Sequence, residues 1–181
     1  RVFNWGTVLD HLRQTAYLTK GIKITFTDER TEKERAEDPS ALPVDSALTS
    51  YTFYFEGGIA SYVKNIDHNK ETKHATVFYI DKIADDIRVE IALQYTEEYT
   101  ETLFAFTNNI YNPDGGTHIA GFRSALTRAL NNYARNKGIL KEKDGALTGD
   151  DVREGLTAII SIKVKDPQFE GQTKAKLGNT E

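Results

Sequence analysis

The chain has 181 residues, of which 39% are hydrophobic and 28% are charged, and its formal net charge is −4. This composition is typical of a globular protein of one domain or slightly more, and the mild negative charge argues against a general polyanion-binding protein. The absence of cysteine excludes disulfides and thiolate metal sites and is compatible with a reducing cytoplasm, and no apolar run approaches the roughly 20 residues that span a bilayer.

The N-terminal third predicts a helix followed by a hairpin. Apolar residues recur at helical spacing in 7–21, and Gly21 fits the left-handed position that often ends a helix. Segments 22–27 and 51–58 alternate as strands do. Residues 28–50 between them are charged, then contain proline and serine, and have no periodicity, so we expect a long surface loop.

The rest of the chain predicts an α+β domain, a mainly antiparallel sheet with helices on one face. Strands 87–96 and 101–110 are expected to pair antiparallel across a turn near residues 97–99. Thr148 and Asp151 have the spacing of a capping box, which predicts a short helix. The expected elements are, in order, helix 57–70, strands 76–80, 87–96 and 101–110, helices 118–138 and 148–156, and strand 158–165.

The strongest helix signal is in 118–138, where one face is apolar and Gly138 is a plausible stop. The residues expected on that face are Ile119, Phe122, Leu126, Ala129, Leu130 and Tyr133.

No combination of residues indicates a complete active site. The histidines have no zinc-type spacing, so a structural or surface role is favoured over metal binding; they are His11, His68, His74 and His118. The pairs Asp85–Asp86 and Asp150–Asp151 are typical of turns and helix starts.

Two segments have both a functional and a structural interpretation. The stretch "PDGGTH" (113–118) is glycine-rich, as phosphate-binding loops are, but it lacks the Walker lysine. A tight turn is therefore favoured, with Gly115 and Gly116 at positive φ and Thr117 as the cap. A basic cluster could contact nucleic-acid phosphate or simply suit a helix C-terminus, which is favoured; it comprises Arg128, Arg135, Lys137, Lys141 and Lys143.

The stretch "FEGQTKAKLG" (169–178) is the most suggestive. Gln172 offers amide donors, Thr173 a hydroxyl and Lys174 a compact positive charge, and together they could hold a terminal phosphate. From chemistry alone, a solvated lysine loop is the simpler interpretation.

Several long sequence blocks favour the phosphate-binding interpretation over the solvated loop. "YFEGGI", "TNNIYNPDGGTHIAGFRSALTRALNNYARNKG", "GDDVREGLTAIIS" and "DPQFEGQTKAKLGN" occur in this order, and the chain resembles the B-subunit family of bacterial type IIA topoisomerases, DNA gyrase and topoisomerase IV. The resemblance covers nearly the whole chain and departs only at 28–50. "YARNKG…LKEKDGALTGDD" looks more like gyrase.

The resemblance implies a domain organisation. Residues 1–57 match the end of an ATPase domain of the gyrase–Hsp90–histidine-kinase–MutL (GHKL) type, a helix and a hairpin. Residues 58–181 match a transducer domain with a ribosomal-protein-S5-like fold (S5 domain 2-like), truncated at its C-terminus. Since the sequence also lacks an initiator methionine, we expect it to be part of a longer protein.

The resemblance also implies the chemistry. Gln172, Thr173 and Lys174 would contact the γ-phosphate of ATP, with Lys174 as the catalytic member. ATP and Mg²⁺ would be cofactors of the full-length topoisomerase, whose remaining ATP-site motifs lie upstream. The fragment alone is expected to be inactive and to bind neither, and no metal ligands are assigned in it.

The implied partners are the gyrase A subunit in an A2B2 assembly, DNA, and a second B subunit on ATP binding, in the cytoplasm and without a membrane. The alternatives are a topoisomerase IV B subunit, a stand-alone S5-like nucleic-acid-binding module, and a scaffold piece in which Lys174 is idle.

Overall fold

The computed structural model describes residues 4–37 and 49–180. The chain divides into two compact units, residues 1–61 and residues 62–181. We describe each unit by itself.

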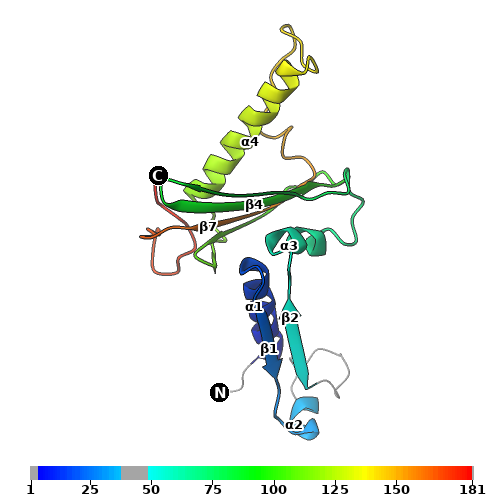
Figure 1. Ribbon diagram of the computed structural model, residues 1–181, viewed down its shortest axis with the longest axis vertical. Helices are drawn as coiled ribbons and strands as arrows, with labels where there is room; N and C mark the ends of the chain where they lie inside the picture. Colours follow the sequence, from blue (N-terminus) through cyan, green and yellow to red (C-terminus); the bar gives the residue numbers. More distant parts are fainter. Residues whose placement is uncertain (1–3, 38–48, 181) are drawn as a thin grey trace. The chain divides into compact units, whose positions relative to one another are not determined.

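The first unit is a helix packed on a two-stranded antiparallel sheet, as the sequence predicts. Helix α1 (Trp5–Leu18) begins at Asn4, whose side chain accepts a hydrogen bond from the Thr7 amide at 2.8 Å. Strands β1 (Lys23–Thr27) and β2 (Ser50–Tyr54) pair antiparallel. Its core is apolar; the buried members are Trp5, Leu9, Ala16 and Phe53. Figure 1 shows α1 beside this hairpin.

The segment between β1 and β2 has more structure than its composition predicts. Helix α2 (Glu32–Ala36) begins with a capping box between Thr31 and Glu34. Asp28 is buried, and hydrogen bonds from Arg30 hold the pKa of this carboxyl below its usual value. The expectation of a long surface loop is therefore wrong for Glu32–Ala36, and residues 38–48 lie outside the described part of the chain.

The second unit is built on a five-stranded mixed sheet in the order β3-β4-β7-β5-β6 (Figure 1). Its strands are β3 (Phe78–Ala84), β4 (Ile87–Tyr95), β5 (Thr102–Thr107), β6 (Ile110–Tyr111) and β7 (Leu156–Lys163). Three of the four pairings are antiparallel, and β5 pairs with β7 in parallel. The α+β class and the mainly antiparallel sheet are confirmed.

The expected antiparallel pairing of the third and fourth predicted strands is wrong, because β7 lies between β4 and β5. Seven consecutive residues of β7 are buried, so this apolar strand takes the centre of the sheet. The start of β7 is held beside the end of β4 by the Thr96 amide, which donates a hydrogen bond to the Gly155 carbonyl at 2.8 Å. A Cβ at Gly155 would lie 2.5 Å from the Thr96 carbonyl, so the close approach of these two segments requires glycine.

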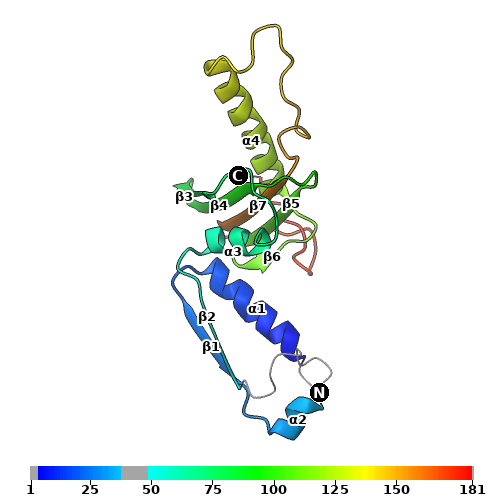
Figure 2. The ribbon, with the colours of Figure 1, turned by 90° about the vertical axis from the view of Figure 1, so that its right-hand side faces the viewer.

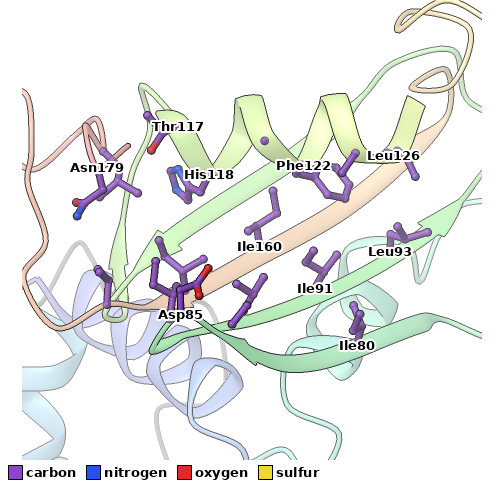
Figure 3. A pocket seen from close by; sticks show the side chains of 18 of the residues that line it. Ile80, Asp85, Ile91, Leu93, Thr117, His118, Phe122, Leu126, Ile160 and Asn179 are labelled. Atoms are coloured by element: carbon purple, nitrogen blue, oxygen red, sulfur yellow. The ribbon is translucent and has the colours of Figure 1, made fainter. Parts of the chain in front are cut away.

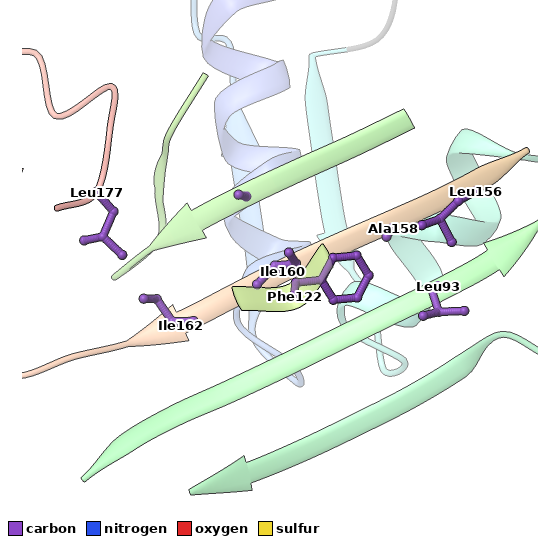
Figure 4. Packing of buried hydrophobic residues seen from close by; sticks show 8 residues of the cluster. Leu93, Phe122, Leu156, Ala158, Ile160, Ile162 and Leu177 are labelled. Atoms are coloured by element: carbon purple, nitrogen blue, oxygen red, sulfur yellow. The ribbon is translucent and has the colours of Figure 1, made fainter. Parts of the chain in front are cut away.

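The two faces of the sheet carry different helices, which corrects the expectation of helices on one face. Helix α4 (Thr117–Asn136) places Phe122 over β7, as Figure 4 shows. Helix α3 (Ile59–Ile66) ends on the opposite face, where Tyr62 stacks on Phe104 and the Thr157 hydroxyl donates to Asp67 at 2.8 Å. Figure 2 shows α3 and α4 on opposite sides of the strands. A strand buried on both sides needs cover on both faces.

Local turn chemistry explains the remaining connections. Asp85 and Asp86 both have positive φ and join β3 to β4, as their sequence predicts. The predicted helix at 148–156 does not form: Thr148 and Asp151 exchange the capping-box hydrogen bonds, but the chain makes only turns before β7 begins. A cap alone therefore does not establish a helix at this position.

Candidate functional site

The loop that carries Gln172, Thr173 and Lys174 is the tip of a narrow hairpin. The Lys174 amide donates to the Gly171 carbonyl at 3.2 Å, which closes a β-turn with Gln172 and Thr173 at its centre. All three polar side chains are exposed. Below the turn the two arms pair, since the Glu170 amide donates to the Lys176 carbonyl at 2.9 Å. The structure thus brings the three sequence-predicted site residues together at one exposed tip.

The stem of this hairpin is anchored by one buried leucine. Leu177 is 2% exposed and belongs to the core beneath α4 (Figure 4). Its amide donates to the Gly115 carbonyl at 3.0 Å, and its carbonyl accepts from the Thr117 amide at 3.2 Å. The "QTK" loop is therefore fixed against the glycine-rich turn that begins α4.

The glycine-rich turn has a structural role of its own. Gly115 and Gly116 have φ of +70° and +138°, as expected. A Cβ at Gly116 would lie 2.3 Å from the Leu177 carbonyl oxygen, so glycine is needed for the hairpin stem to lie this close. The expected cap is wrong: Gly116 is the N-cap residue and Thr117 is already the first residue of the helix, which no side chain of the described residues caps.

Lys174 is held in an unusual backbone conformation. Its φ is +57°, a left-handed conformation that is uncommon for residues other than glycine, asparagine and aspartate. Its carbonyl accepts a hydrogen bond from the buried Asn112 side chain at 2.7 Å, and the next carbonyl, of Ala175, accepts from the Asp114 amide at 3.0 Å. Within residues 4–37 and 49–180, no ion pair engages the Lys174 ammonium. Its charge is available to a ligand.

The supporting residues were not predicted from sequence. Asn112, Leu177 and Asn179 are buried although they lie in polar segments. Asn179 holds the base of the hairpin by accepting from the Gln168 amide at 2.6 Å. The one available signal was Leu177, a large apolar residue after a mostly polar stretch.

A second feature is an apolar groove of about 560 Å³ between α4 and the sheet. Figure 3 shows His118, Phe122 and Leu126 from α4 facing Ile91 and Ile160 across it. Neither ring nitrogen of His118 has a hydrogen-bond partner among the residues that the structure describes, and burial lowers the pKa of this imidazole to about 4. The predicted apolar face of α4 is only partly buried, since Tyr133 is 58% exposed.

The histidines, the acidic pairs and the basic cluster do not form a recognisable binding site within the described residues. Among the described residues, no three His, Cys, Asp or Glu side chains gather as metal ligands, and no helix is both long and apolar enough to cross a membrane. In the basic cluster, Arg135 donates to the carbonyls of Lys141 and Asp144 at 3.2 and 3.3 Å, so it closes the loop after α4. A contact between this cluster and nucleic acid stays a prediction.

Comparison with known proteins decides the family. The family model described as DNA gyrase B matches residues 58–181. The chain belongs to the DNA gyrase B family. The DNA gyrase B protein of Bacillus mycoides is 47% identical over 179 residues, and that of Staphylococcus aureus is 48% identical over 180 residues. Each match covers 99% of this chain but 41% and 26% of the relative, respectively, so the chain spans less than half of these DNA gyrase B proteins.

Solved structures of the family have the same fold. The 43K ATPase domain of Thermus thermophilus gyrase B, solved with an aminocoumarin, matches with a TM-score of 0.81 and 34% identity over 99% of this chain and 44% of that one. The gyrase B protein of Myxococcus xanthus matches with a TM-score of 0.75 and 26% identity over 97% of this chain and 45% of that one.

Proposed function

We propose that the complete protein is the B subunit of a DNA gyrase, an ATP-dependent type IIA topoisomerase that couples nucleotide turnover to DNA strand passage and supercoiling. The observation that carries this proposal is 47–48% identity to DNA gyrase B proteins along 99% of the chain. Because these relatives are gyrases, supercoiling is preferred to the decatenation expected of a topoisomerase IV B subunit.

The domain assignment is part of the same proposal. Residues 1–57 would be the end of the GHKL-type ATPase domain, and residues 58–181 would be most of an S5-like transducer domain. In support, the family model begins at residue 58, and the boundary of the two compact units falls between Ser61 and Tyr62. The role of this region would be to relay the state of the nucleotide to the rest of the protein.

Lys174 would be the catalytic residue of this region, with Gln172 and Thr173 beside it at the ATP γ-phosphate. Three features support the assignment: the side chains are exposed on one turn, the stem of the turn is pinned to the core, and the ammonium has no ion-pair partner among the described residues. A fixed ammonium beside a phosphoryl group stabilises the charge that develops during transfer.

The residues present fit a phosphate contact but not a complete nucleotide site. Lys174 supplies one positive charge, and the described residues offer no cluster of metal ligands for Mg²⁺. ATP and Mg²⁺ would therefore be bound chiefly by other parts of the full-length protein. Loss of the phosphate would remove the ligand of Lys174, and such a differential contact is what a nucleotide-driven switch requires.

The proposed partners follow from the same family. In the cytoplasm the full-length protein would assemble with the gyrase A subunit as A2B2, act on DNA, and pair with a second copy of itself when ATP binds.

Steady-state ATPase kinetics of the full-length protein test the proposal. Lys174→Ala should lower kcat by about 30-fold to 900-fold, equivalent to about 2–4 kcal/mol of transition-state stabilisation, with a smaller change in KM. Lys174→Arg should restore little, because a planar fork replaces a compact charge. Lys176→Ala is the matched control, since Lys176 is paired with Glu170 at 3.1 Å. If Lys174→Ala keeps kcat within about twofold of wild type, the scaffold interpretation replaces this one.

A further inference from the structure

We propose that Asn112 is a positioning residue for Lys174, which it ties to strand β5 so that the sheet sets the place of the ammonium. The proposal rests on the proposed contact between Lys174 and the ATP phosphate. Asn112 itself does not touch the nucleotide and acts through the backbone of the loop.

A continuous set of hydrogen bonds, running from the buried end of β5 to the loop, carries the inference. The Thr107 hydroxyl, at the end of β5, donates to Asn112 Oδ1 at 2.8 Å, and Asn112 Nδ2 donates to the Lys174 carbonyl at 2.7 Å. The Asn112 amide donates to the Ala105 carbonyl of the same strand at 2.9 Å. Thr107 and Asn112 are 0% and 1% exposed, so the bond between them is shielded from water, whereas the bond to the Lys174 carbonyl is partly buried.

The orientation of the Asn112 amide is determined by its partners. If Oδ1 accepts from Thr107, Nδ2 must face Lys174, where it meets a carbonyl that can only accept. A flipped amide would place two acceptors against each other. The side chain can therefore act as a rigid link between β5 and the loop.

Such a link matters because the side chains at the loop tip are not buried, so the backbone is held by its hydrogen bonds. Gln172, Thr173 and Lys174 are all exposed, and the positive φ of Lys174 is a strained conformation that persists only where its surroundings impose it. Asn112 holds the carbonyl of Lys174 and the Asp114 amide holds that of Ala175. Two consecutive carbonyls fixed from one side define the peptide plane that follows Lys174.

The test is a double-mutant cycle in the full-length protein with ATPase kinetics as the readout. Loss of the hydrogen bond that places the lysine should make Asn112→Ala lower kcat by about fivefold to twentyfold with KM nearly unchanged. Asn112→Ala combined with Lys174→Ala should be no slower than Lys174→Ala alone, because the asparagine acts only through the lysine.

Asn131→Ala is the matched control for general destabilisation. The Asn131 side chain also makes two hydrogen bonds, donating to the Leu147 carbonyl at 2.9 Å and accepting from the Leu147 amide at 2.8 Å, but it holds a different loop. Its kcat should equal that of wild type. Should Asn112→Ala fail to fold, Thr107→Val removes the donor that orients the amide while preserving shape, and its kcat should fall severalfold.

The outcomes separate this inference from the proposed function. If Lys174→Ala itself leaves kcat unchanged, the phosphate contact is wrong and the inference falls with it. If Lys174→Ala is slow but Asn112→Ala and Thr107→Val match wild type, or if the Asn112 and Lys174 effects simply multiply, the lysine contact stands and the positioning role of Asn112 is refuted.

Discussion

Gly116→Ala is the sharpest perturbation of the packing between the glycine-rich turn and the hairpin stem. The new Cβ would lie 2.3, 2.6 and 2.8 Å from the carbonyl oxygen, the amide nitrogen and the Cβ of Leu177. Carbon contacts are optimal at about 3.5–4.0 Å, so the hairpin must retreat by about 1 Å. Two hydrogen bonds flank the clash, from the Leu177 amide to Gly115 and from the Thr117 amide to Leu177.

The loss of stability expected for Gly116→Ala follows from these contacts and from the backbone conformation of Gly116. Weakening two backbone hydrogen bonds removes about 2 kcal/mol, and a φ of +138° adds at least about 1 kcal/mol for a residue with a Cβ. We expect Gly116→Ala to lower the free energy of unfolding by about 3 kcal/mol. Urea unfolding followed by circular dichroism measures the loss, and hydrogen exchange of the Leu177 amide reports where it occurs.

Gly121→Ala is the internal control for this experiment. Gly121 lies within α4, and no atom lies within 4 Å of the position of its Cβ. Alanine there should stabilise the chain by about 0.5–1 kcal/mol. A Gly116→Ala variant as stable as wild type, with Leu177 equally protected, would refute the role assigned to the close approach.

Two further predictions concern buried polar groups. The pKa of His118 is lowered from 6.5 to about 4, so the folded chain binds fewer protons than the unfolded chain between these values, and stability falls as pH drops through this window. After allowance for partial exposure, the free energy of unfolding should fall by about 1–2 kcal/mol across this window. His118→Gln should remove this pH dependence when urea unfolding is measured at several pH values; the same pH dependence in both proteins would contradict the lowered pKa of His118. Thr157→Val should lower the free energy of unfolding by about 2 kcal/mol in the same assay. Asp67 is 3% exposed, and its carboxylate would then keep, among the described residues, the contact with Lys70 at 3.3 Å alone; a neutral effect would show that Asp67 does not depend on this bond.

The elements governed by local chemistry could be predicted from the sequence. The helical spacing in α4, the alternation in β4 and the Asp85–Asp86 turn are each encoded within a few residues. Gly21 and Gly138 have the expected positive φ near helix ends. In each case the neighbouring residues suffice to determine the conformation.

The order of the strands in the sheet could not be predicted from neighbouring residues, because it depends on pairing between segments far apart in the sequence. β4 and β5 follow each other and have a short connection, which favours a hairpin. Their separation is imposed by β7, which begins at Leu156 and enters beside Thr96 through the close approach at Gly155. Similarly, α3 lies opposite α4 because β7 must be covered on both faces, a requirement set by sheet order and not by the helix sequence.

The candidate loop was found by its resemblance to a family. The residues that support the loop were found only in the structure. Glutamine, threonine and lysine at a glycine-containing turn do not by themselves distinguish a phosphate contact from a solvated loop. Asn112 gave no signal in the sequence, because an asparagine before a proline is also typical of an ordinary turn. Its importance depends on its burial and on its bonds to Thr107 and Lys174.

Chemical labelling from the nucleotide phosphate would show directly whether Lys174 reaches ATP. An acyl phosphate of ATP transfers its acyl group to a lysine amine next to the terminal phosphate, and peptide mass spectrometry of the full-length protein identifies that lysine. We expect labelling at Lys174 that excess ATP prevents, with Lys176, paired to Glu170, labelled weakly and without protection. ATP-protected labelling of other lysines with none at Lys174 would contradict the proposed phosphate contact.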